Sequence, residues 1–114
     1  MRDPNCIFCK IASGDIKSEI LHQDDDVMVF RDANPKAPFH ALVIPREHVA
    51  SLLEAREPRL LGLIVLAAAK VASEGGYGRN GFRVVANSGP DAGQSVAHLH
   101  FHVLAGRKLD WPPG

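Results

Sequence analysis

Cysteine is scarce in this 114-residue sequence, and there is no excess of charge of either sign. The two cysteines, Cys6 and Cys9, lie only three positions apart and could hardly cross-link a fold, which argues against a secreted disulfide scaffold. The 13 Lys and Arg residues balance 13 Asp and Glu residues, and no basic tract stands out. This balance argues against duplex nucleic acid as a partner, because such binding depends on neutralising many phosphates. A nucleotide-sized anion needs only a local site and is not excluded.

Long hydrophobic runs are also missing. The longest, residues 63–69, is far too short to span a bilayer, and the N-terminal segment MRDPNCIFCK lacks the apolar core of a signal peptide. We therefore expect a soluble cytoplasmic protein with no membrane partner. The length predicts a single domain over residues 1–114, which is large enough to bury a core without stabilising cross-links.

Apolar runs and turn signals along the chain predict short strands and one main helix. Pro58 near the start of the helix and Gly75-Gly76 after its end mark its limits. The helix is expected at residues 57–73, and strands are expected at residues 20–23, 27–30, 40–44, 81–87 and in the histidine-rich stretch that follows. This order predicts an α+β domain with an antiparallel sheet.

The predicted helix is apolar on more than one face. Leu60, Ile64, Ala67 and Val71 form one face, and most of the remaining surface is also apolar through Leu61, Leu63, Val65, Leu66 and Ala68. A helix of this kind needs two partners to cover it. One is the sheet of the same domain, and we expect the other to be a second copy of the chain in a two-fold homodimer.

Three histidines alternate with apolar residues in the stretch AHLHFHVL. In a strand, His98, His100 and His102 share one face, and Leu99, Phe101 and Val103 share the other. The row is compatible with a polar outer face, with a metal site or with catalysis. A straight row separates its outer members by about 13 Å, which is too far for both to ligate one ion at about 2.1 Å. Catalysis by one histidine with support from its neighbours therefore fits better.

Residues 98–104, HLHFHVL, resemble the signature of the histidine triad family, in which three histidines alternate with apolar residues. Asp32 and residues 34–45, NPKAPFHALVIP, resemble the nucleotide-binding hairpin of the same family. Residues 93–96, GQSV, and the ending WPPG at residues 111–114 resemble its Hint branch, the histidine triad nucleotide-binding proteins. The resemblance covers nearly the whole chain.

The resemblance implies a homodimeric purine nucleoside phosphoramidase, which hydrolyses the P–N bond of adenosine 5′-phosphoramidates through a nucleotidylated histidine. It implies that His100 is the nucleophile, that His102 holds the phosphate oxygens, that His40 lies behind His102, and that Ser95 bonds the leaving group. The imidazole of His100 needs one free nitrogen, and we expect the carbonyl of His98 to hold the proton of the other. A dinucleoside polyphosphate hydrolase of the Fhit-like branch and a nucleotide-binding adaptor with incidental hydrolysis are the alternatives.

Further residues are expected to bind the nucleotide. Gly93 lets the backbone approach an anion, where the N–H groups of Gln94 and Ser95 can donate to phosphate. Asp32 is expected on the ribose hydroxyls, although a solvated turn aspartate is the alternative. The apolar residues expected to hold the base could equally be ordinary core. The complete expected set is Ile7, Phe8, Ile11, Phe30, Asp32, Ala33, Asn34, Asn87, Gly93, Gln94, Ser95, Val96, His100, His102 and Trp111.

The cysteine pair is compatible with a redox pair, half of a zinc site, or two free buried cysteines. No βαβ context for a thioredoxin-like motif is evident. Histidine triad proteins with such a pair bind structural zinc through the histidine of a Pro-x-x-His segment and the first triad histidine. The resemblance thus implies a closed zinc site at Cys6, Cys9, His48 and His98. We expect no organic cofactor.

Overall fold

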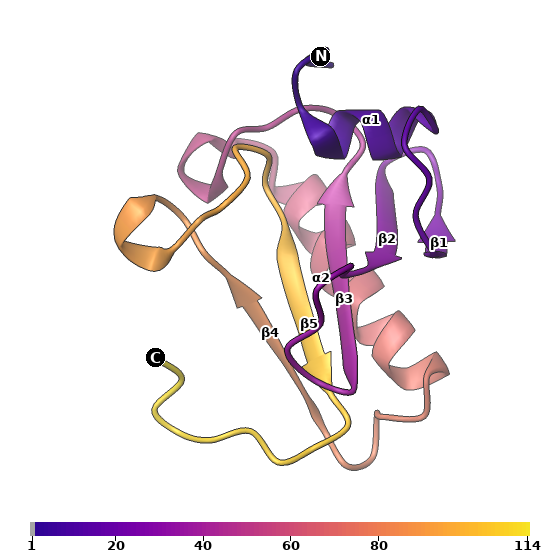
Figure 1. Cartoon of the computed structure of the whole chain (residues 1–114), viewed down its shortest axis with the longest axis vertical. Helices are drawn as coiled ribbons and strands as arrows, with labels where there is room; N and C mark the ends of the chain where they lie inside the picture. Colours follow the sequence, from indigo (N-terminus) through magenta and orange to yellow (C-terminus); the bar gives the residue numbers. More distant parts are fainter. Residues whose placement is uncertain (1) are drawn as a thin grey trace.

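The computed structural model describes residues 2–114, which form one five-stranded antiparallel sheet with strand order β1-β2-β3-β5-β4 (Figure 1). The elements along the chain are α1 (Ile7–Ser13), β1 (Ile20–Gln23), β2 (Val27–Arg31), β3 (Phe39–Pro45), α2 (Pro58–Glu74), β4 (Phe82–Ala86) and β5 (Phe101–Ala105), with short 3-10 turns at Leu52–Glu54 and Pro90–Ala92. The predicted α+β class with an antiparallel sheet and one main helix is confirmed. The short helix α1 was not among the predicted elements.

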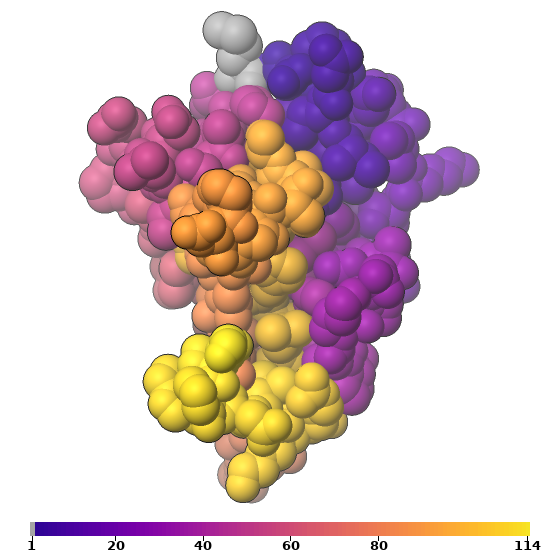
Figure 2. Space-filling view, turned by 60° about the vertical axis from the view of Figure 1, so that its left-hand side comes forward, coloured from indigo at the N-terminus to yellow at the C-terminus, as the bar shows by residue number. Residues whose placement is uncertain are grey.

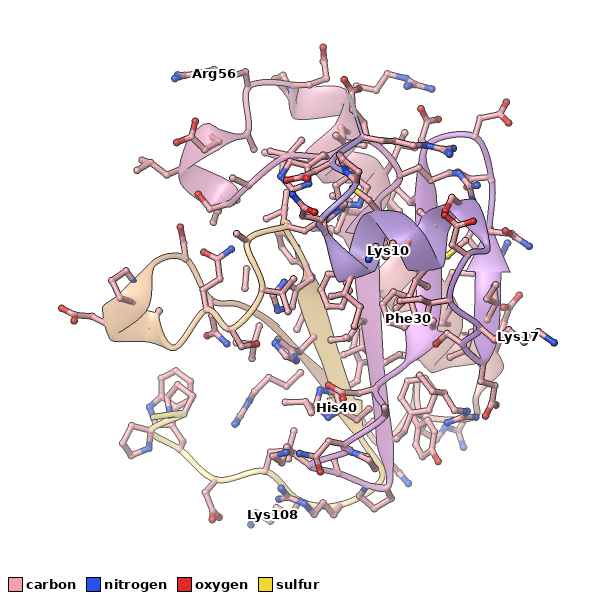
Figure 3. The ribbon with its side chains drawn as sticks, turned by 45° about the horizontal axis from the view of Figure 1, so that its top comes forward. Lys10, Lys17, Phe30, His40, Arg56 and Lys108 are labelled. Carbon is pink, nitrogen blue, oxygen red and sulfur yellow. The ribbon has the colours of Figure 1, made fainter. Side chains whose placement is uncertain are left out.

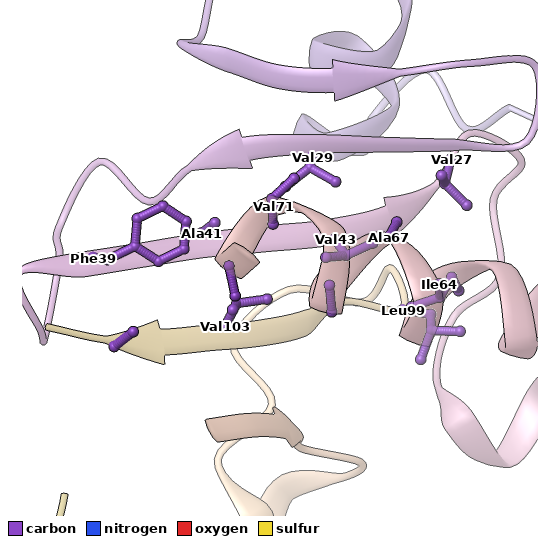
Figure 4. Packing of buried hydrophobic residues seen from close by; sticks show 13 residues of the cluster. Val27, Val29, Phe39, Ala41, Val43, Ile64, Ala67, Val71, Leu99 and Val103 are labelled. Atoms are coloured by element: carbon purple, nitrogen blue, oxygen red, sulfur yellow. The ribbon is translucent and has the colours of Figure 1, made fainter. Parts of the chain in front are cut away.

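The sheet is covered on both faces. The long helix α2 packs against one face over a core that includes Val29, Val43 and Val103 (Figure 4). A second cluster, which includes Phe8 of α1 and Met28 of β2, lies on the other face. Because successive residues of β2 belong alternately to these two clusters, the central strands are buried on both sides and show no polar alternation.

Local capping fixes the limits of both helices. The Cys6 sulfur accepts the N–H of Cys9 at the start of α1, and Gly14 ends that helix in the left-handed conformation, which glycine adopts without strain. The Glu57 side chain accepts the N–H of Arg59, and Pro58 takes the first helical position of α2. Glu57 is therefore the cap of the predicted helix 57–73 and not its first turn.

The histidine row departs from the predicted straight strand. β5 begins at Phe101, so only His102 of the three histidines lies in a strand. Beyond the Val43–Phe101 pair the two chains separate, and the N–H of Leu99 bonds the carbonyl of Val49 at 2.6 Å instead of pairing with β3. The alternation of faces still holds in part, because Leu99 and Val103 are both buried in the cluster under α2. His98 stays on the same side of the sheet as His100, because the rings of both contact Phe8 in the cluster opposite α2. The ring of His98 also lies 5.0 Å from that of His48.

The outer surface of α2 remains apolar. Ile64 and Ala68 are fully buried against the sheet, whereas Val65 is 48% exposed and Leu66 is 68% exposed. Strand β4 forms one edge of the sheet, next to β5 only. Among the described residues, no helix is both long and apolar enough to cross a membrane.

The C-terminal tail runs over the surface below the loop that contains Pro90–Ala92 (yellow and orange in Figure 2). Trp111 is 80% exposed, and the Arg83 guanidinium lies 6.0 Å from the centre of its ring. Arg83 also donates to the Asp110 carbonyl at 2.9 Å. These contacts tie the tail to β4.

Candidate functional site

One ring nitrogen of His100 is engaged in a hydrogen bond, and the other is free to react. Its Nδ1 lies 2.8 Å from the carbonyl oxygen of His98, the acceptor expected from the sequence. A carbonyl only accepts, so Nδ1 carries the proton and donates it, and the lone pair of the neutral ring is left on Nε2. The side chain is buried, with 4% of its surface exposed, and it borders a pocket. His100 therefore offers a fixed nucleophilic nitrogen to whatever the pocket holds.

A chain of hydrogen bonds fixes the proton positions of the next two histidines. The backbone N–H of Lys36 donates to His40 Nδ1 at 2.9 Å, so the proton of a neutral His40 is on Nε2. This Nε2 lies 2.9 Å from Nδ1 of His102 and 3.4 Å from a carboxylate oxygen of Asp32. His102 Nδ1 accepts from His40, which leaves the His102 proton on Nε2. His102 thus has one N–H to donate to an anion in the pocket that it lines.

Burial keeps both of these histidines neutral. It lowers the pKa of His102 to about 4, and the nearby His100 and His40 act in the same direction. Burial also lowers the pKa of His40, in spite of the opposing carboxylate of Asp32. Near neutral pH the pair is therefore uncharged, and its hydrogen-bond directions are set by the Lys36 amide rather than by protonation.

The lowered pKa of His102 makes the stability of the protein depend on pH. The usual value is 6.5 and the folded value is about 4, so in between the unfolded chain binds a proton that the folded chain does not. The free energy of unfolding therefore falls as the pH drops through that range. We expect the wild-type Tm to fall between about pH 7 and about pH 5, and the His102→Gln variant to show a shallower fall.

Thermal melts of the two proteins over that pH range measure the difference in the slope of Tm against pH. The buried His98 contributes equally to the slopes of wild type and His102→Gln. Gln23→Asn, on the edge strand β1, removes no titratable group, so this control should keep the wild-type slope. Parallel curves for wild type and His102→Gln would contradict the assignment of a low pKa to His102.

The pocket has a volume of about 320 Å³ and lies between α1 and the edges of β2, β3 and β5. Phe8 and Phe30 meet edge to face, with ring centres 5.5 Å apart, and Phe8 also contacts the ring of His100 at 5.1 Å. The apolar wall thus leads directly to the nucleophilic histidine. Of the residues expected to bind a nucleotide, the pocket is lined by Ile7, Phe8, Ile11, Phe30, Asp32, Ala33, Ser95, Val96, His100 and His102.

Five lining residues were missed by sequence reasoning: Ile16, Lys17, Ser18, Arg31 and Leu42. Leu42 pairs with Phe30 of β2 and with His102 of β5, and neither register was specified from the sequence. Ile16, Lys17 and Ser18 belong to the loop after α1, and no motif pointed to it. Lys17 extends outward from this loop, whereas Phe30 lies beneath α1 (Figure 3).

Asp32 is more than a solvated turn residue. One carboxylate oxygen accepts the N–H of Asn34 at 2.8 Å, and the other faces His40. The side chain also lines the pocket. Asp32 therefore shapes the loop before β3 and presents a carboxylate to a ligand, while Asn34 itself does not line the pocket.

Other expected residues lie outside the pocket lining: His40, Asn87, Gly93, Gln94 and Trp111. Gln94 differs most from its expected role, because its backbone N–H bonds the Gly89 carbonyl at 3.1 Å and is not available to phosphate. Its side chain accepts from Gly89 N–H and donates to the carbonyls of Ala50 and Val96. Gln94 therefore stabilises the loop through these hydrogen bonds. Ser95 does line the pocket, so its hydroxyl remains a candidate donor.

The two cysteines meet two histidines in a compact cluster. Ligand atoms of Cys6, Cys9, His48 and His98 all lie within 4.8 Å of one another. The sulfur-to-nitrogen distances are 3.3 Å for Cys6 and His98, and 3.4 Å and 3.6 Å from Cys9 to His48 and His98. Tetrahedral zinc with bonds of about 2.3 Å to sulfur and about 2.0–2.1 Å to nitrogen places such atoms about 3.6 Å apart. The donor set therefore fits zinc in both chemistry and spacing.

The surroundings of the cluster also suit a cation. His98 Nε2 donates to the Pro45 carbonyl at 2.9 Å, which turns the lone pair of Nδ1 toward the cysteines. Burial lowers the pKa of His98 to about 4, so this ligand is neutral. Burial also raises the pKa of the Cys9 thiol, a cost that a dication removes by stabilising the thiolate.

Comparisons with known proteins agree on one family. The model of that family, described as HIT domain, matches residues 13–109. An uncharacterized HIT-like protein of Synechococcus elongatus is 46% identical over 110 residues, 95% of this chain and 96% of that protein. A 14 kDa zinc-binding protein of Zea mays is 42% identical over 116 residues, 98% of this chain and 90% of that protein.

Solved structures give the same result. A HIT family hydrolase from Legionella pneumophila has a TM-score of 0.94 and 41% identity, over 96% of this chain and 100% of that chain. A histidine triad nucleotide-binding protein from Candida albicans has a TM-score of 0.83 and 32% identity, over 95% of this chain and 83% of that chain.

Proposed function

Because the chain belongs to the histidine triad (HIT) family of hydrolases, we propose that it hydrolyses the P–N bond of purine nucleoside 5′-phosphoramidates. The observation that carries the proposal is the fixed tautomer of His100, whose Nδ1 is bound to the His98 carbonyl while the ring borders a nucleotide-sized pocket. A nitrogen nucleophile next to an anion-binding N–H on His102 suits attack on phosphorus.

In the first step, the Nε2 lone pair of His100 attacks phosphorus and forms a new P–N bond. The bond from phosphorus to the amine breaks, and its electron pair stays on the amine nitrogen, which takes up a proton through the Ser95 hydroxyl. The His100 ring becomes cationic, and its Nδ1–H donates to the His98 carbonyl more strongly in this state. His102 Nε2–H holds a phosphoryl oxygen.

In the second step, water attacks the phosphorus of nucleotidyl-His100. The P–N bond to His100 breaks and its electron pair returns to Nε2, so the histidine is neutral again. The attacking water releases one proton, which balances the proton taken up by the amine. The cycle thus converts a phosphoramidate and water into a nucleoside monophosphate and a free amine.

The pocket supports a purine nucleotide as the substrate. Phe8 and Phe30 supply aromatic walls for a flat base, and Ile7 and Ile11 complete the apolar end. Asp32 also lines the pocket, which supports its proposed role of accepting the ribose hydroxyls. An apolar slot accepts adenine and guanine alike.

Parallel assays on two substrate classes test the proposal. We expect adenosine 5′-phosphoramidate to be hydrolysed with a kcat/KM at least about 100-fold above that for diadenosine polyphosphate, because we assign the Ser95 hydroxyl to an amine leaving group. Chromatographic detection of AMP measures both rates. The reverse preference would indicate the dinucleoside polyphosphate hydrolase, and tight AMP binding without turnover of either substrate would indicate the adaptor.

We propose that Cys6, Cys9, His48 and His98 hold a structural zinc ion. The Zea mays relative is a zinc-binding protein by name, which supports this assignment. When bound, the ion supplies a cross-link and no reaction chemistry, because four protein ligands leave no open position. The residues themselves join α1 to the segment after β3 and to the chain just before His100. The reduced thiols of such a site are consistent with the proposed cytoplasmic location.

We propose that the protein is a two-fold homodimer. Among the described residues, nothing packs over the exposed side chains of Val65 and Leu66 on α2. Strand β4 is an edge strand, so the backbone hydrogen-bonding groups on its outer side have no partner strand in the sheet. A second copy covers both features at once, and it brings a second Trp111 tail into the assembly. The expected role of Trp111 at the site rests on this dimer.

The exposed face of α2 provides the test of the dimer. We expect Leu66→Glu to convert a micromolar dimer into a monomer, because an unpaired charge buried at an interface costs several kcal/mol. Sedimentation velocity measures the change. Ile20→Glu places the same charge on the opposite edge of the sheet, at a residue that is 41% exposed, and should stay dimeric. A monomeric wild type at micromolar concentration would contradict the proposal.

A further inference from the structure

A second pocket adjoins the nucleotide pocket and shares one residue with it. Its volume is about 290 Å³, and it is lined by Ala50, Gly89, Pro90, Gln94, Ser95 and Ala97. Ser95 lines both pockets. The loop that forms most of this pocket lies at the front of the molecule in Figure 2, in orange, beside the segment around residue 50. The two pockets therefore meet at Ser95, the residue whose hydroxyl is proposed to serve the leaving nitrogen.

The walls of this second pocket carry no charged side chain. Ala50, Pro90 and Ala97 present aliphatic carbon, and the polar side chain of Gln94 is occupied. Both N–H groups of its amide donate, at 2.8 Å and 2.9 Å, and its oxygen accepts the Gly89 N–H at 3.0 Å. Apart from the Ser95 hydroxyl, no lining side chain offers a free hydrogen-bond donor to a bound group. A charged substituent would thus find no charged partner among the lining side chains, whereas a carbon chain gains apolar contacts with Ala50, Pro90 and Ala97.

The same hydrogen bonds make the pocket rigid. The Gln94 amide ties three backbone groups, on Gly89, Ala50 and Val96, to one side chain. Gly93 keeps the turn closed with a φ of 82°, in the left-handed region that favours glycine, and its N–H bonds the Pro90 carbonyl. A pocket held in this way binds its occupant without first being ordered.

We propose that this pocket, the amine pocket, receives the substituent on the leaving nitrogen and selects uncharged, apolar amines. The inference rests on the proposed phosphoramidase activity and names the substrate class. The leaving nitrogen is one bond from phosphorus, and phosphorus must lie between His100, His102 and Ser95 during the reaction. A substituent that passes Ser95 enters the amine pocket, where its carbon chain meets Ala50, Pro90 and Ala97. P–N cleavage proceeds as above and releases the amine with its added proton.

A substrate series on the wild-type protein tests the amine pocket. Adenosine 5′-phosphoramidates of butylamine, β-alanine and 1,4-diaminobutane carry an apolar, an anionic and a cationic substituent of similar length. We expect kcat/KM for butylamine to exceed that for the two charged amines by at least about 10-fold. The unsubstituted phosphoramidate, which releases ammonia and cannot fill the pocket, reports the basal activity.

The Ala97→Glu variant reverses the preference if the assignment is correct. Its carboxylate should lower kcat/KM for butylamine and for β-alanine and raise it for 1,4-diaminobutane, while the unsubstituted substrate changes less than about 2-fold. Ala92→Glu, in the same loop but outside the pocket lining, is the matched control and should leave the series unchanged. Both residues are exposed, so neither variant disturbs the core.

The outcomes separate this inference from the proposed function. Equal rates for all three substituted amines on wild type, or the same change for every substrate in Ala97→Glu, would overturn the amine pocket while leaving the phosphoramidase intact. Absence of turnover of the unsubstituted substrate by wild type would overturn the phosphoramidase itself, and the amine pocket with it.

Discussion

Replacement of His100 by alanine is expected to lower kcat for adenosine 5′-phosphoramidate by about 10³-fold or more. His100 supplies the covalent route itself, and its Nε2 is the nitrogen left free by the bond from Nδ1 to the His98 carbonyl. His102 cannot replace it, because His102 Nδ1 is occupied by His40 and the proton lies on Nε2. The loss should appear in kcat, since the nucleotide pocket keeps its apolar walls.

Two further measurements define the role of His100. AMP should still bind to His100→Ala with an affinity close to that of wild type, as measured by calorimetry. Rapid quenching of wild type with substrate should trap a nucleotide on the peptide that contains His100, detected by mass spectrometry. His22→Ala removes a histidine that pairs with Asp24 outside the pocket, and it should keep full activity. A His100→Ala enzyme that retained more than a few per cent of the wild-type rate would contradict a covalent mechanism on this residue.

The alternation of histidines with apolar residues predicted which side chains of this stretch are buried, whereas the roles of the histidines came from the family resemblance. Leu99 and Val103 are buried under α2, as their positions between the histidines require. The expected grouping of His98 with Cys6, Cys9 and His48 agrees with the structure, but the extent of the strand does not. Whether a strand keeps its partner depends on where the neighbouring chain turns, and here β3 ends at Pro45.

Side-chain roles that depend on loop geometry could not be predicted. Gln94 occupies a motif position where both phosphate binding and loop bracing are chemically reasonable, and only its contacts with Gly89, Ala50 and Val96 distinguish them. Lys17 lines the pocket because of the path of the chain after α1, which no periodicity encodes. The second pocket is likewise a property of how two distant segments meet at Ala50 and Ala97.

Phe8 connects the two halves of the site. It lies between Cys6 and Cys9 in the sequence, and its ring contacts both Phe30 in the pocket wall and His100. The ring of His98, a member of the cysteine cluster, lies 5.9 Å from Phe8 on its other side. The cluster therefore holds α1 against the sheet at the point where α1 supplies the apolar end of the nucleotide pocket. A metal bound to the cluster would affect substrate binding only through this position.

Loss of zinc is expected to lower Tm by about 10 °C or more, because binding free energy at a structural site is folding free energy. The cluster joins α1, the segment with His48, and the chain before β5, and α1 has little else beyond the apolar cluster on its face of the sheet. Two buried thiolates and two neutral imidazoles around a dication form a neutral unit. Without the dication, burial raises the pKa of Cys9 and so disfavours its thiolate. The folded fraction should keep its intrinsic rate, since no zinc ligand touches the phosphorus.

Elemental analysis of protein purified without added metal should give about one zinc per chain, the stoichiometry of a closed four-ligand site. The thiols of Cys6 and Cys9 should resist a thiol reagent until a chelator is added, since zinc-bound thiolates are held by the metal. His48→Ala removes the most accessible ligand of the four, and it should lose zinc and stability together while His22→Ala retains both. Calorimetry of chelated wild type and of His48→Ala should then give similar Tm values. Less than about half a zinc per chain, with both thiols reacting freely, would instead identify Cys6 and Cys9 as two free buried cysteines.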